Sequence, residues 1–337
     1  MNAEFHAFAV AALAGIAINA AAFELSDPRI RVDEQTDIAW LNEDEILFQG
    51  FTLKALQEMR RGDISANYRA TRILYIANVT SGEVREHVRL DRNGGFCYSA
   101  GRISYKKEGG NLWFGEFGAE KEAGGASKTV AGDAFAERLR CQDIDRSRYP
   151  QWPSELVVLL EEHGVIELRY ADHARQYLGV YLWKPGAVEP VFVTDKRLSG
   201  LYYAPFKRAY FWGRPGYLDR TPTEGLWLYP DGRVETLVIP PGRWNEFRST
   251  NATFLPTKVG MLVLIGGPDH VTYLLPPDRS RPNNFRSEEM RTVFRGVAWR
   301  FAVSPNGCRL AVATGAKRIP NTDPSHLEVI DLCTAYR

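Results

Sequence analysis

The chain has 337 residues, of which 45% are hydrophobic and 25% are charged, which is the balance of a folded globular protein and not of a disordered one. Its 42 Lys and Arg residues nearly cancel its 41 Asp and Glu residues, leaving a formal net charge of +1. No global field therefore attracts nucleic acid, and we expect no nucleic-acid partner.

The N-terminal segment differs in composition from the rest of the chain. Residues 7–18 form a short apolar stretch, and three alanines follow at 20–22. An apolar core that ends in Ala-x-Ala is typical of a secretory signal peptide, and this one is too short for a membrane span. Glu4 and His6 stand where such peptides usually carry Lys or Arg, so a short amphipathic or disordered N-terminus is the alternative.

We therefore expect a signal peptide over residues 1–22 and one mature domain over 23–337, with no integral membrane segment in the mature chain. The expected location is periplasmic or secreted. It is cytoplasmic if the N-terminus is not a signal peptide.

After residue 26 the chain repeats one pattern, in which two apolar runs flank a turn that contains Gly. The clearest hairpins cover residues 74–85, 180–193 and 226–239. With weaker units near Gly118 and Asp278, the pattern recurs about every 50 residues, which is typical of β-propeller blades. The sequence predicts an all-β fold, a single β-propeller of six four-stranded blades. Seven blades stay open because the second and fifth units are irregular.

The last unit shows the pattern most completely. Strands are expected at 299–303, 309–313 and 326–332, with a turn at 304–307. The chain then ends before a fourth strand. We expect residues 29–32 to supply that strand, which would close the ring and leave no exposed edge.

Four cysteines occur in the chain. Cys308 opens the second strand of the last unit and Cys333 ends the third, so antiparallel pairing predicts a disulfide between them. Cys97 and Cys141 would form the second disulfide by elimination. Four reduced, buried thiols are the alternative for a cytosolic chain. The cysteines form no CxxC pair and have no His at zinc-ligand spacing, so no metal site is predicted.

Residues 304–312 read Ser-Pro-Asn-Gly-Cys-Arg-Leu-Ala-Val. This segment resembles the Ser-Pro-Asp-Gly-x-x-Leu-Ala-Phe signature of the WD40-like repeats in TolB-type periplasmic propellers, and residues 40–47 are similar in outline. The first ~25 residues do not resemble the extra N-terminal domain of TolB itself. The resemblance implies a propeller fold, a periplasmic location and the binding of a partner.

Catalytic and cofactor motifs are missing from the sequence. There is no Gly-x-Ser-x-Gly elbow, no His-Glu-x-x-His and no phosphate-binding glycine loop. We therefore predict no cofactor and assign no catalytic residue. His163 and His173 lie near several carboxylates, and Asp143 lies near Asp145, but loop and turn residues more commonly have this composition.

Long connections give a better indication of a binding surface. In a propeller the connections from the second to the third strand emerge on one face, and loops on a rigid scaffold often bind ligands. Several of these connections are long here and carry Arg, Tyr, His or Lys, which are candidates for contact residues. Ordinary solvated loops are the alternative. The candidate residues are Arg60, Arg61, Tyr68, His173, Arg175, Tyr177, Arg214, Tyr217, Arg220, Lys317 and Arg318.

Two other features were considered for a role in binding. Strand aromatics such as Tyr202, Phe211 and Trp227 are expected to pack between blades instead of forming a sugar platform. Residues 116–133 and 279–289 read as insertions, the second on the face opposite the long loops. Either could be a docking element or a tolerated excursion.

The first functional hypothesis is a non-enzymatic, exported propeller that binds a protein or an envelope polymer through its long-loop face. The second is a carbohydrate-active hydrolase or lyase with its site at the mouth of the central channel. A third, a cytosolic sensor or scaffold, requires that residues 1–22 are no signal. Carboxylates, Arg and Tyr converging at the channel mouth would favour the enzyme, and a filled channel would favour the binding protein.

Overall fold

Antiparallel pairing between successive strands organises this protein. The structure is a computed structural model that describes residues 21–25, 30–32, 38–51, 55, 57, 72–91, 95–99, 101–122, 156–159, 165–170, 177–183, 188–195, 201–213, 223–229, 233–240, 252–265, 271–281, 283–296, 298–314 and 326–336. Within these ranges the strands form six sheets, numbered 1 to 6 here. Two short helices with described bounds are η3 (Pro205–Lys207) and α4 (Leu332–Ala335).

The first three sheets follow one another along the chain. Sheet 1 contains β2 (Arg31–Val32), β3 (Ala39–Trp40), β4 (Glu45–Phe51), β5 (Arg72–Asn78) and β6 (Val84–Leu90). Sheet 2 contains β7 (Phe96–Ser99), β8 (Arg102–Lys106), β9 (Leu112–Glu116) and β10 (Lys121–Glu122). Sheet 3 contains β11 (Leu156–Leu159), β12 (Val165–Tyr170), β13 (Tyr177–Trp183) and β14 (Val191–Thr194).

The other three sheets complete the described strands, and the last of them takes one strand from the N-terminal end. Sheet 4 contains β15 (Leu201–Ala204), β16 (Ala209–Gly213), β17 (Thr223–Leu228) and β18 (Val234–Ile239). Sheet 5 contains β19 (Ala252–Thr257), β20 (Gly260–Ile265), β21 (Val271–Leu275) and β22 (Arg291–Arg295). Sheet 6 contains β23 (Ala298–Val303), β24 (Arg309–Thr314), β25 (His326–Asp331) and β1 (Ala21–Glu24).

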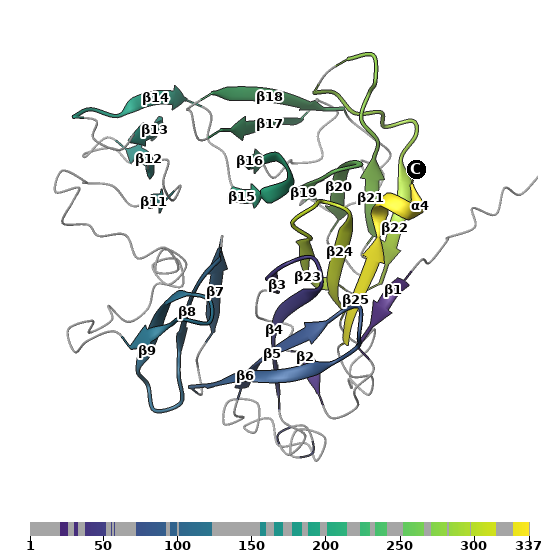
Figure 1. Cartoon of the computed structure of the whole chain (residues 1–337). Coiled ribbons are helices and arrows are strands. Elements are labelled where there is room, and N and C mark those ends of the chain that lie inside the picture. Colours follow the sequence, from purple (N-terminus) through teal and green to yellow (C-terminus); the bar gives the residue numbers. More distant parts are fainter. Residues whose placement is uncertain are drawn as a thin grey trace, which may run out of the picture.

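The sheets lie side by side around a centre, with strands such as β14 and β18 at the perimeter (Figure 1). This is the predicted all-β propeller arrangement. Its blade count is five, so the predicted six blades, and the seven left open, are not confirmed. Core clusters of buried side chains join sheets 1, 2, 4, 5 and 6, whereas no side chain described in sheet 3 belongs to them.

Burial along the strands explains why these segments adopt this fold. The second and third strands of sheet 5, β20 and β21, are buried at every residue and apolar apart from Thr272, as expected for strands covered on both faces. The outer strand β6 instead exposes residues such as Arg85 and Glu86. Charged outer strands discourage pairing with other chains at the ring's perimeter.

The ring closes through the N-terminal end, but with a different segment from the one predicted. β1 pairs antiparallel with β25, placing Phe23 opposite Val329. The predicted segment, residues 29–32, contributes β2 instead, which pairs with β4 in sheet 1. Residues 21–25 close the ring because Phe23 and the buried Leu25 pack into the core that sheets 1 and 6 share. Two residues of β1 therefore fall inside the predicted signal segment 1–22.

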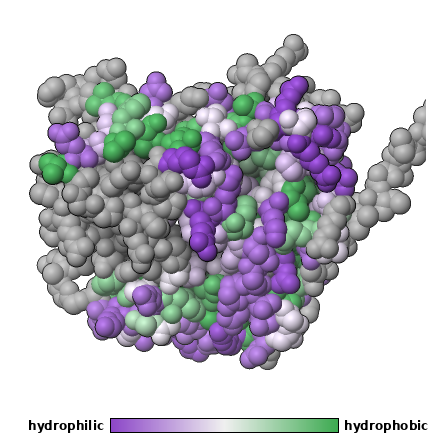
Figure 2. Space-filling view, turned by 45° about the horizontal axis from the view of Figure 1, so that its top comes forward, coloured by the Kyte–Doolittle hydropathy of each residue, from purple (hydrophilic) through white to green (hydrophobic). Residues whose placement is uncertain are grey.

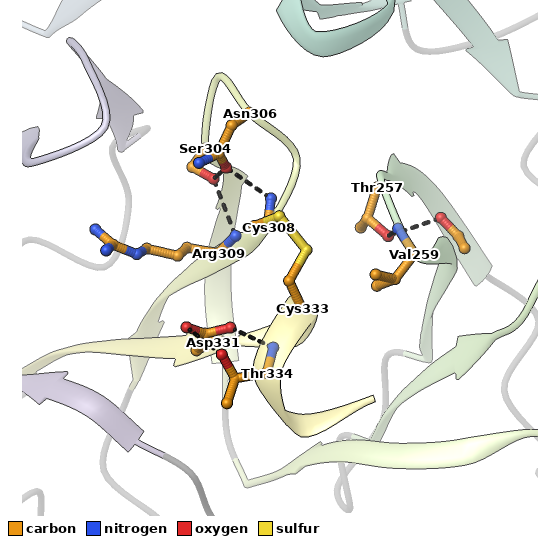
Figure 3. Close-up of a disulfide and its surroundings, with 10 residues drawn as sticks. Thr257, Val259, Ser304, Asn306, Cys308, Arg309, Asp331, Cys333 and Thr334 are labelled. Atoms are coloured by element: carbon orange, nitrogen blue, oxygen red, sulfur yellow. Dashed lines mark hydrogen bonds between the residues drawn. A yellow bond between two sulfur atoms is a disulfide. The ribbon is translucent and has the colours of Figure 1, made fainter. Parts of the chain in front are cut away.

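The predicted disulfide between Cys308 and Cys333 is confirmed, with the two Cα atoms 5.0 Å apart (Figure 3). It joins the start of β24 to α4, directly after β25. Asp331 caps α4 by accepting a hydrogen bond of 2.8 Å from the backbone N–H of Thr334. Cys97 is also disulfide-bonded, and its predicted partner, Cys141, lies outside the described residues.

Candidate functional site

The predicted contact residues of the long-loop face fall almost entirely outside the described part of the chain. This holds for Arg60, Arg61, Tyr68, His173, Arg175, Arg214, Tyr217, Arg220, Lys317 and Arg318. Tyr177 is described as the first residue of β13, where it lies opposite Tyr170 of β12. The structure therefore leaves the grouping of these residues as a prediction.

The opposite ends of the strands carry the connections that the structure describes. Here the turns between the first and second strands of sheets 4, 5 and 6 contact one another. The backbone N–H of Lys258, between β19 and β20, donates a hydrogen bond of 3.0 Å to the carbonyl of Gly307, between β23 and β24. A Cβ on Gly307 would lie 2.8 Å from Phe206 Cδ1 in η3. Glycine is required at 307 because its φ of +76° is also left-handed.

The turn before β24 is itself held by side chains, as drawn in Figure 3. Ser304 is fully buried, and its Oγ accepts a hydrogen bond of 2.9 Å from the backbone N–H of Arg309. Asn306 Oδ1 accepts a hydrogen bond of 2.8 Å from the backbone N–H of Cys308. These bonds explain why Ser304 and Asn306 suit this turn.

The long connection between β21 and β22 crosses from sheet 5 to sheet 4. The backbone N–H of Val238 in β18 donates a hydrogen bond of 3.1 Å to the carbonyl of Asn283. Within the connection, Pro277 and Phe285 form an isolated antiparallel bridge. The segment at 279–289, predicted as an excursion, is thus a fixed bridge between two sheets.

A cleft of about 320 Å³ lies beneath this bridge, between sheets 4 and 5. Such a volume is at the lower end of the range for small-molecule sites and is large enough for one bulky side chain or one sugar unit. Its walls combine apolar and aromatic residues with a few polar groups. The lining residues are Phe206, Lys207, Trp227, Leu237, Pro256, Thr257, Lys258, Gly260, Met261, Pro277, Asp278, Asn283, Asn284 and Phe285.

One wall of the cleft is stabilised by Lys207. Its ammonium lies 4.6 Å from the centroid of the Trp227 ring, and 3.4 Å from Oε2 of Glu235. Tyr229 donates a hydrogen bond of 2.8 Å to the same Glu235 oxygen. A cation over an indole face and beside a carboxylate is held in one orientation.

The pKa values of this group follow from the contacts. Burial raises the pKa of Tyr229 to about 12, and the Glu235 carboxylate adds to the shift. Burial alone would raise the pKa of Glu235, but the Tyr229 hydroxyl and the Lys207 ammonium together lower it. Glu235 therefore stays ionised at neutral pH, and the Lys207 ammonium and the Arg233 guanidinium both pair with it.

The remaining charges of the cleft are Asp278 and Lys258. Asp278 Oδ1 lies 3.5 Å from the Arg286 guanidinium and accepts hydrogen bonds from the backbone N–H and hydroxyl of Ser280, at 2.9 and 2.6 Å. Those bonds, and Arg286 after them, lower the pKa of Asp278. Lys258 is exposed, and its ammonium forms no ion pair with any residue that the structure describes. The cleft thus carries one positive charge that the described residues leave uncompensated.

Some of the innermost strands are joined to one another by side-chain hydrogen bonds. The hydroxyl of Tyr202 in β15 donates a hydrogen bond of 3.3 Å to the carbonyl of Val303 in β23. These strands belong to sheets 4 and 6, which sheet 5 separates along the chain. Burial raises the pKa of Tyr202, which keeps this hydroxyl protonated. Trp40 of β3 makes a similar contact, donating from Nε1 to the carbonyl of Ala302 at 3.0 Å.

Sequence reasoning missed the cleft because its lining comes from separate turns. Lys207 and Lys258 look like ordinary exposed turn residues in the sequence. The single indication was the polar excursion at 279–289. The prediction that strand aromatics pack between blades is confirmed for Phe211 and Trp227, which are 1% and 4% exposed.

Other kinds of site were sought in the same ranges. The described His, Cys, Asp and Glu residues form no group of three or more that could hold a metal ion. Among the described helices none is long and apolar enough to cross a membrane.

Neither a protein-family model nor a curated protein matches the chain. Similar solved structures include "YCF48 bound to D1 peptide", 11% identical, covering 92% of this chain and 95% of that chain with a TM-score of 0.35. YCF48 from Cyanidioschyzon merolae is 9% identical, covering 90% and 97% with a TM-score of 0.40. An acylaminoacyl peptidase from Pyrococcus horikoshii is 12% identical, covering 90% and 54% with a TM-score of 0.46. Likeness at this level carries no argument about function, and the TolB-type family is not confirmed.

Proposed function

We propose that this chain is a non-enzymatic propeller that binds a protein or an envelope polymer. The observation that carries the proposal is the hydrogen bond between the inner strands β15 and β23, from Tyr202 to Val303. A propeller enzyme of the alternative kind would place its substrate at the channel mouth. At this depth the inner strands are instead linked by a buried hydroxyl, which supports binding at the periphery of the channel.

Two surfaces are proposed to make contact with the partner. One is the predicted loop face, with Arg60, Arg61 and Tyr68 among its residues. The other is the cleft between sheets 4 and 5, which has an apolar interior and a charged rim. This composition is usual for a site that takes one anchoring group of a larger ligand.

Photo-crosslinking tests the proposal at both surfaces. The photoreactive residue p-benzoylphenylalanine would replace Phe285 in the cleft or Tyr68 on the loop face, with Glu86 on the exposed outer strand β6 as the control. Crosslinking would be done in cells of the source organism. We expect adducts from position 285, from position 68 or from both, and none from position 86.

Adducts of equal yield at all three positions would contradict a specific site. A second assay addresses the enzyme alternative, in which purified protein is incubated with a panel of polysaccharides. Depolymerisation that is lost in Tyr202→Phe or in a channel-mouth variant would overturn the proposal of a non-enzymatic function.

Export is the second part of the proposal. The Cys308–Cys333 disulfide supports it, because such bonds persist in oxidising compartments. The intact mass of chain expressed with its native N-terminus tests it. A mass lacking the segment before β1, with both disulfides present, is expected. A full-length chain with free thiols would contradict export.

We also propose that sheet 3 completes a ring of six blades. Its strand order, from β11 to β14, follows the chain just as the orders of sheets 4 and 5 do. The shared order supports a common role for all six sheets. An experimental map with five blades, and with sheet 3 packed outside the ring, would exclude it.

A further inference from the structure

The cleft between sheets 4 and 5 has features that select among possible ligands. Of its aromatic residues, Trp227 is only 4% exposed, and the Lys207 ammonium lies over its ring. Phe206 approaches Gly307 so closely that a Cβ there would lie 2.8 Å from its ring. Trp227 therefore offers no open face on which a sugar could stack, and Phe206 is covered on the side that faces Gly307.

The interior of the cleft suits a bulky apolar side chain better. Leu237 and Met261 are almost fully buried beside it, at 2% and 1% exposure, and two prolines and Phe285 complete its apolar lining. Such an interior gains free energy by excluding water from an apolar group, at about 25 cal/mol per Å² of buried surface. Against Leu237, Met261 and the prolines, the hydroxyl groups of a sugar unit would find no hydrogen-bond partner.

The charges at the rim indicate what lies beside that side chain in a ligand. Lys207 pairs with Glu235, which also pairs with Arg233, and Arg286 pairs with Asp278. Lys258 has no such partner among the residues that the structure describes, so a carboxylate next to the cleft would find a cation there. The exposed Asn283 adds an amide that can pair with a peptide backbone.

We propose that the cleft binds an acidic peptide segment, with a bulky apolar side chain inside it and a neighbouring carboxylate paired with Lys258. This inference rests on the proposed binding function and names the class of partner for one of its two surfaces. The carboxylate makes charge-assisted hydrogen bonds with the ammonium at the rim, where salt screens them in part.

Three capped, fluorescein-labelled peptides test the inference with the purified full chain. They have the sequences Gly-Asp-Phe-Asp-Gly, Gly-Lys-Phe-Lys-Gly and Gly-Asp-Ala-Asp-Gly, and fluorescence anisotropy measures their binding. We expect the first peptide to bind at least about tenfold more tightly than the other two, since each lacks either the carboxylates or the anchor.

Variants place the binding in the cleft. Lys258→Glu is expected to weaken binding of the first peptide about tenfold or more, and Lys258→Gln less. Lys121→Glu, on the exposed strand β10, is the matched control and should change binding less than about twofold. Circular dichroism of each variant confirms that the fold is retained. Equal weakening by both charge reversals would show a general charge effect and overturn the inference.

Further outcomes separate this inference from the proposed function. Crosslinks from position 285 without binding of the acidic peptide would keep the binding function and overturn the peptide class. Binding of oligogalacturonate that depends on Lys258, without peptide binding, would also overturn it in favour of an acidic polysaccharide. No peptide binding and no crosslink at either surface would overturn both.

Discussion

Sheets 6 and 3 share one design of four antiparallel strands but differ in how their strands are covered. In sheet 6, Leu310, Val312 and Val329 are fully buried, and a disulfide joins the end of the sheet to its turn. In sheet 3 the outer strand leaves Val191 and Phe192 each 51% exposed. Figure 2 shows hydrophobic surface at upper left, the side of the view on which β14 lies.

The difference shows that equal strand patterns do not imply equal stability. Hydrophobic stabilisation follows the apolar area that neighbours remove from water, and sheet 6 has sheets 1 and 5 as neighbours in shared cores. β14 carries no charged residue within its bounds, whereas the outer strands β6, β18 and β22 each carry at least one. The part of the ring where the chain ends meet thus combines cores shared with both neighbouring sheets and a covalent bond.

Shortening a side chain in each sheet should show most clearly how the two sheets differ in their contribution to stability. Leu310→Ala is expected to lower the free energy of unfolding by about 3 to 5 kcal/mol, because it leaves a cavity in a fully buried site. Val191→Ala in sheet 3 should cost less than about 0.5 kcal/mol. Chemical denaturation measures both, and similar losses would contradict the comparison.

Removal of the crosslink should have the next largest effect. The double variant Cys308→Ser with Cys333→Ser opens a loop of 25 residues, so a loss of about 2 to 4 kcal/mol is expected. The same denaturation experiment measures it. A reductant should then add only the effect of the bond at Cys97. If the double variant were as stable as the parent, the Cys308–Cys333 bond would contribute nothing to the free energy of unfolding.

The contact between turns can be tested with a matched pair of glycines. Gly307→Ala should cost about 2 kcal/mol, because the new Cβ lies 2.8 Å from the Lys258 backbone nitrogen in addition to the left-handed strain. Gly118 has a similar φ of +85° but open space around it, so Gly118→Ala should cost only about 1 kcal/mol. Thermal unfolding of the two variants compares the values. Identical shifts would mean that the turns of sheets 4, 5 and 6 can separate freely.

The smallest effect is expected at the boundary between sheets 1 and 2, where His87 stacks on Phe117 at 4.8 Å. Burial lowers the pKa of His87 below its ordinary 6.5, against the opposing effect of Glu120. The unfolded chain therefore takes up the proton first as the pH falls, so this group makes the fold less stable in acid. His87→Gln should reduce the loss of stability between about pH 7 and about pH 5.5. An unchanged pH profile would show that His87 is not desolvated.

Local signals were sufficient to predict the hairpins, the last unit and the Cys308–Cys333 bond. Each depends on neighbours along the chain or on one strand pair, such as Arg309 opposite Asp331. The closure strand was misplaced because Ala21 and Ala22 belong to the predicted signal segment 1–22, so residues 29–32 were the next candidate strand. The cleft could not be predicted, since the contact from Val238 to Asn283 depends on how two sheets meet. To predict the burial of Trp227, the general preference of aromatic side chains for the core was sufficient.

The pairing of β1 with β25 has a consequence for the timing of folding. At a synthesis rate of about 5 to 20 residues per second, roughly 15 to 60 seconds pass between the two strands. During that interval the earliest sheets exist without the strands that complete the ring, and the apolar Phe23 and Leu25 have no partner on β25. The pairing that joins the two ends of the chain is therefore the last strand pairing that a nascent chain can form.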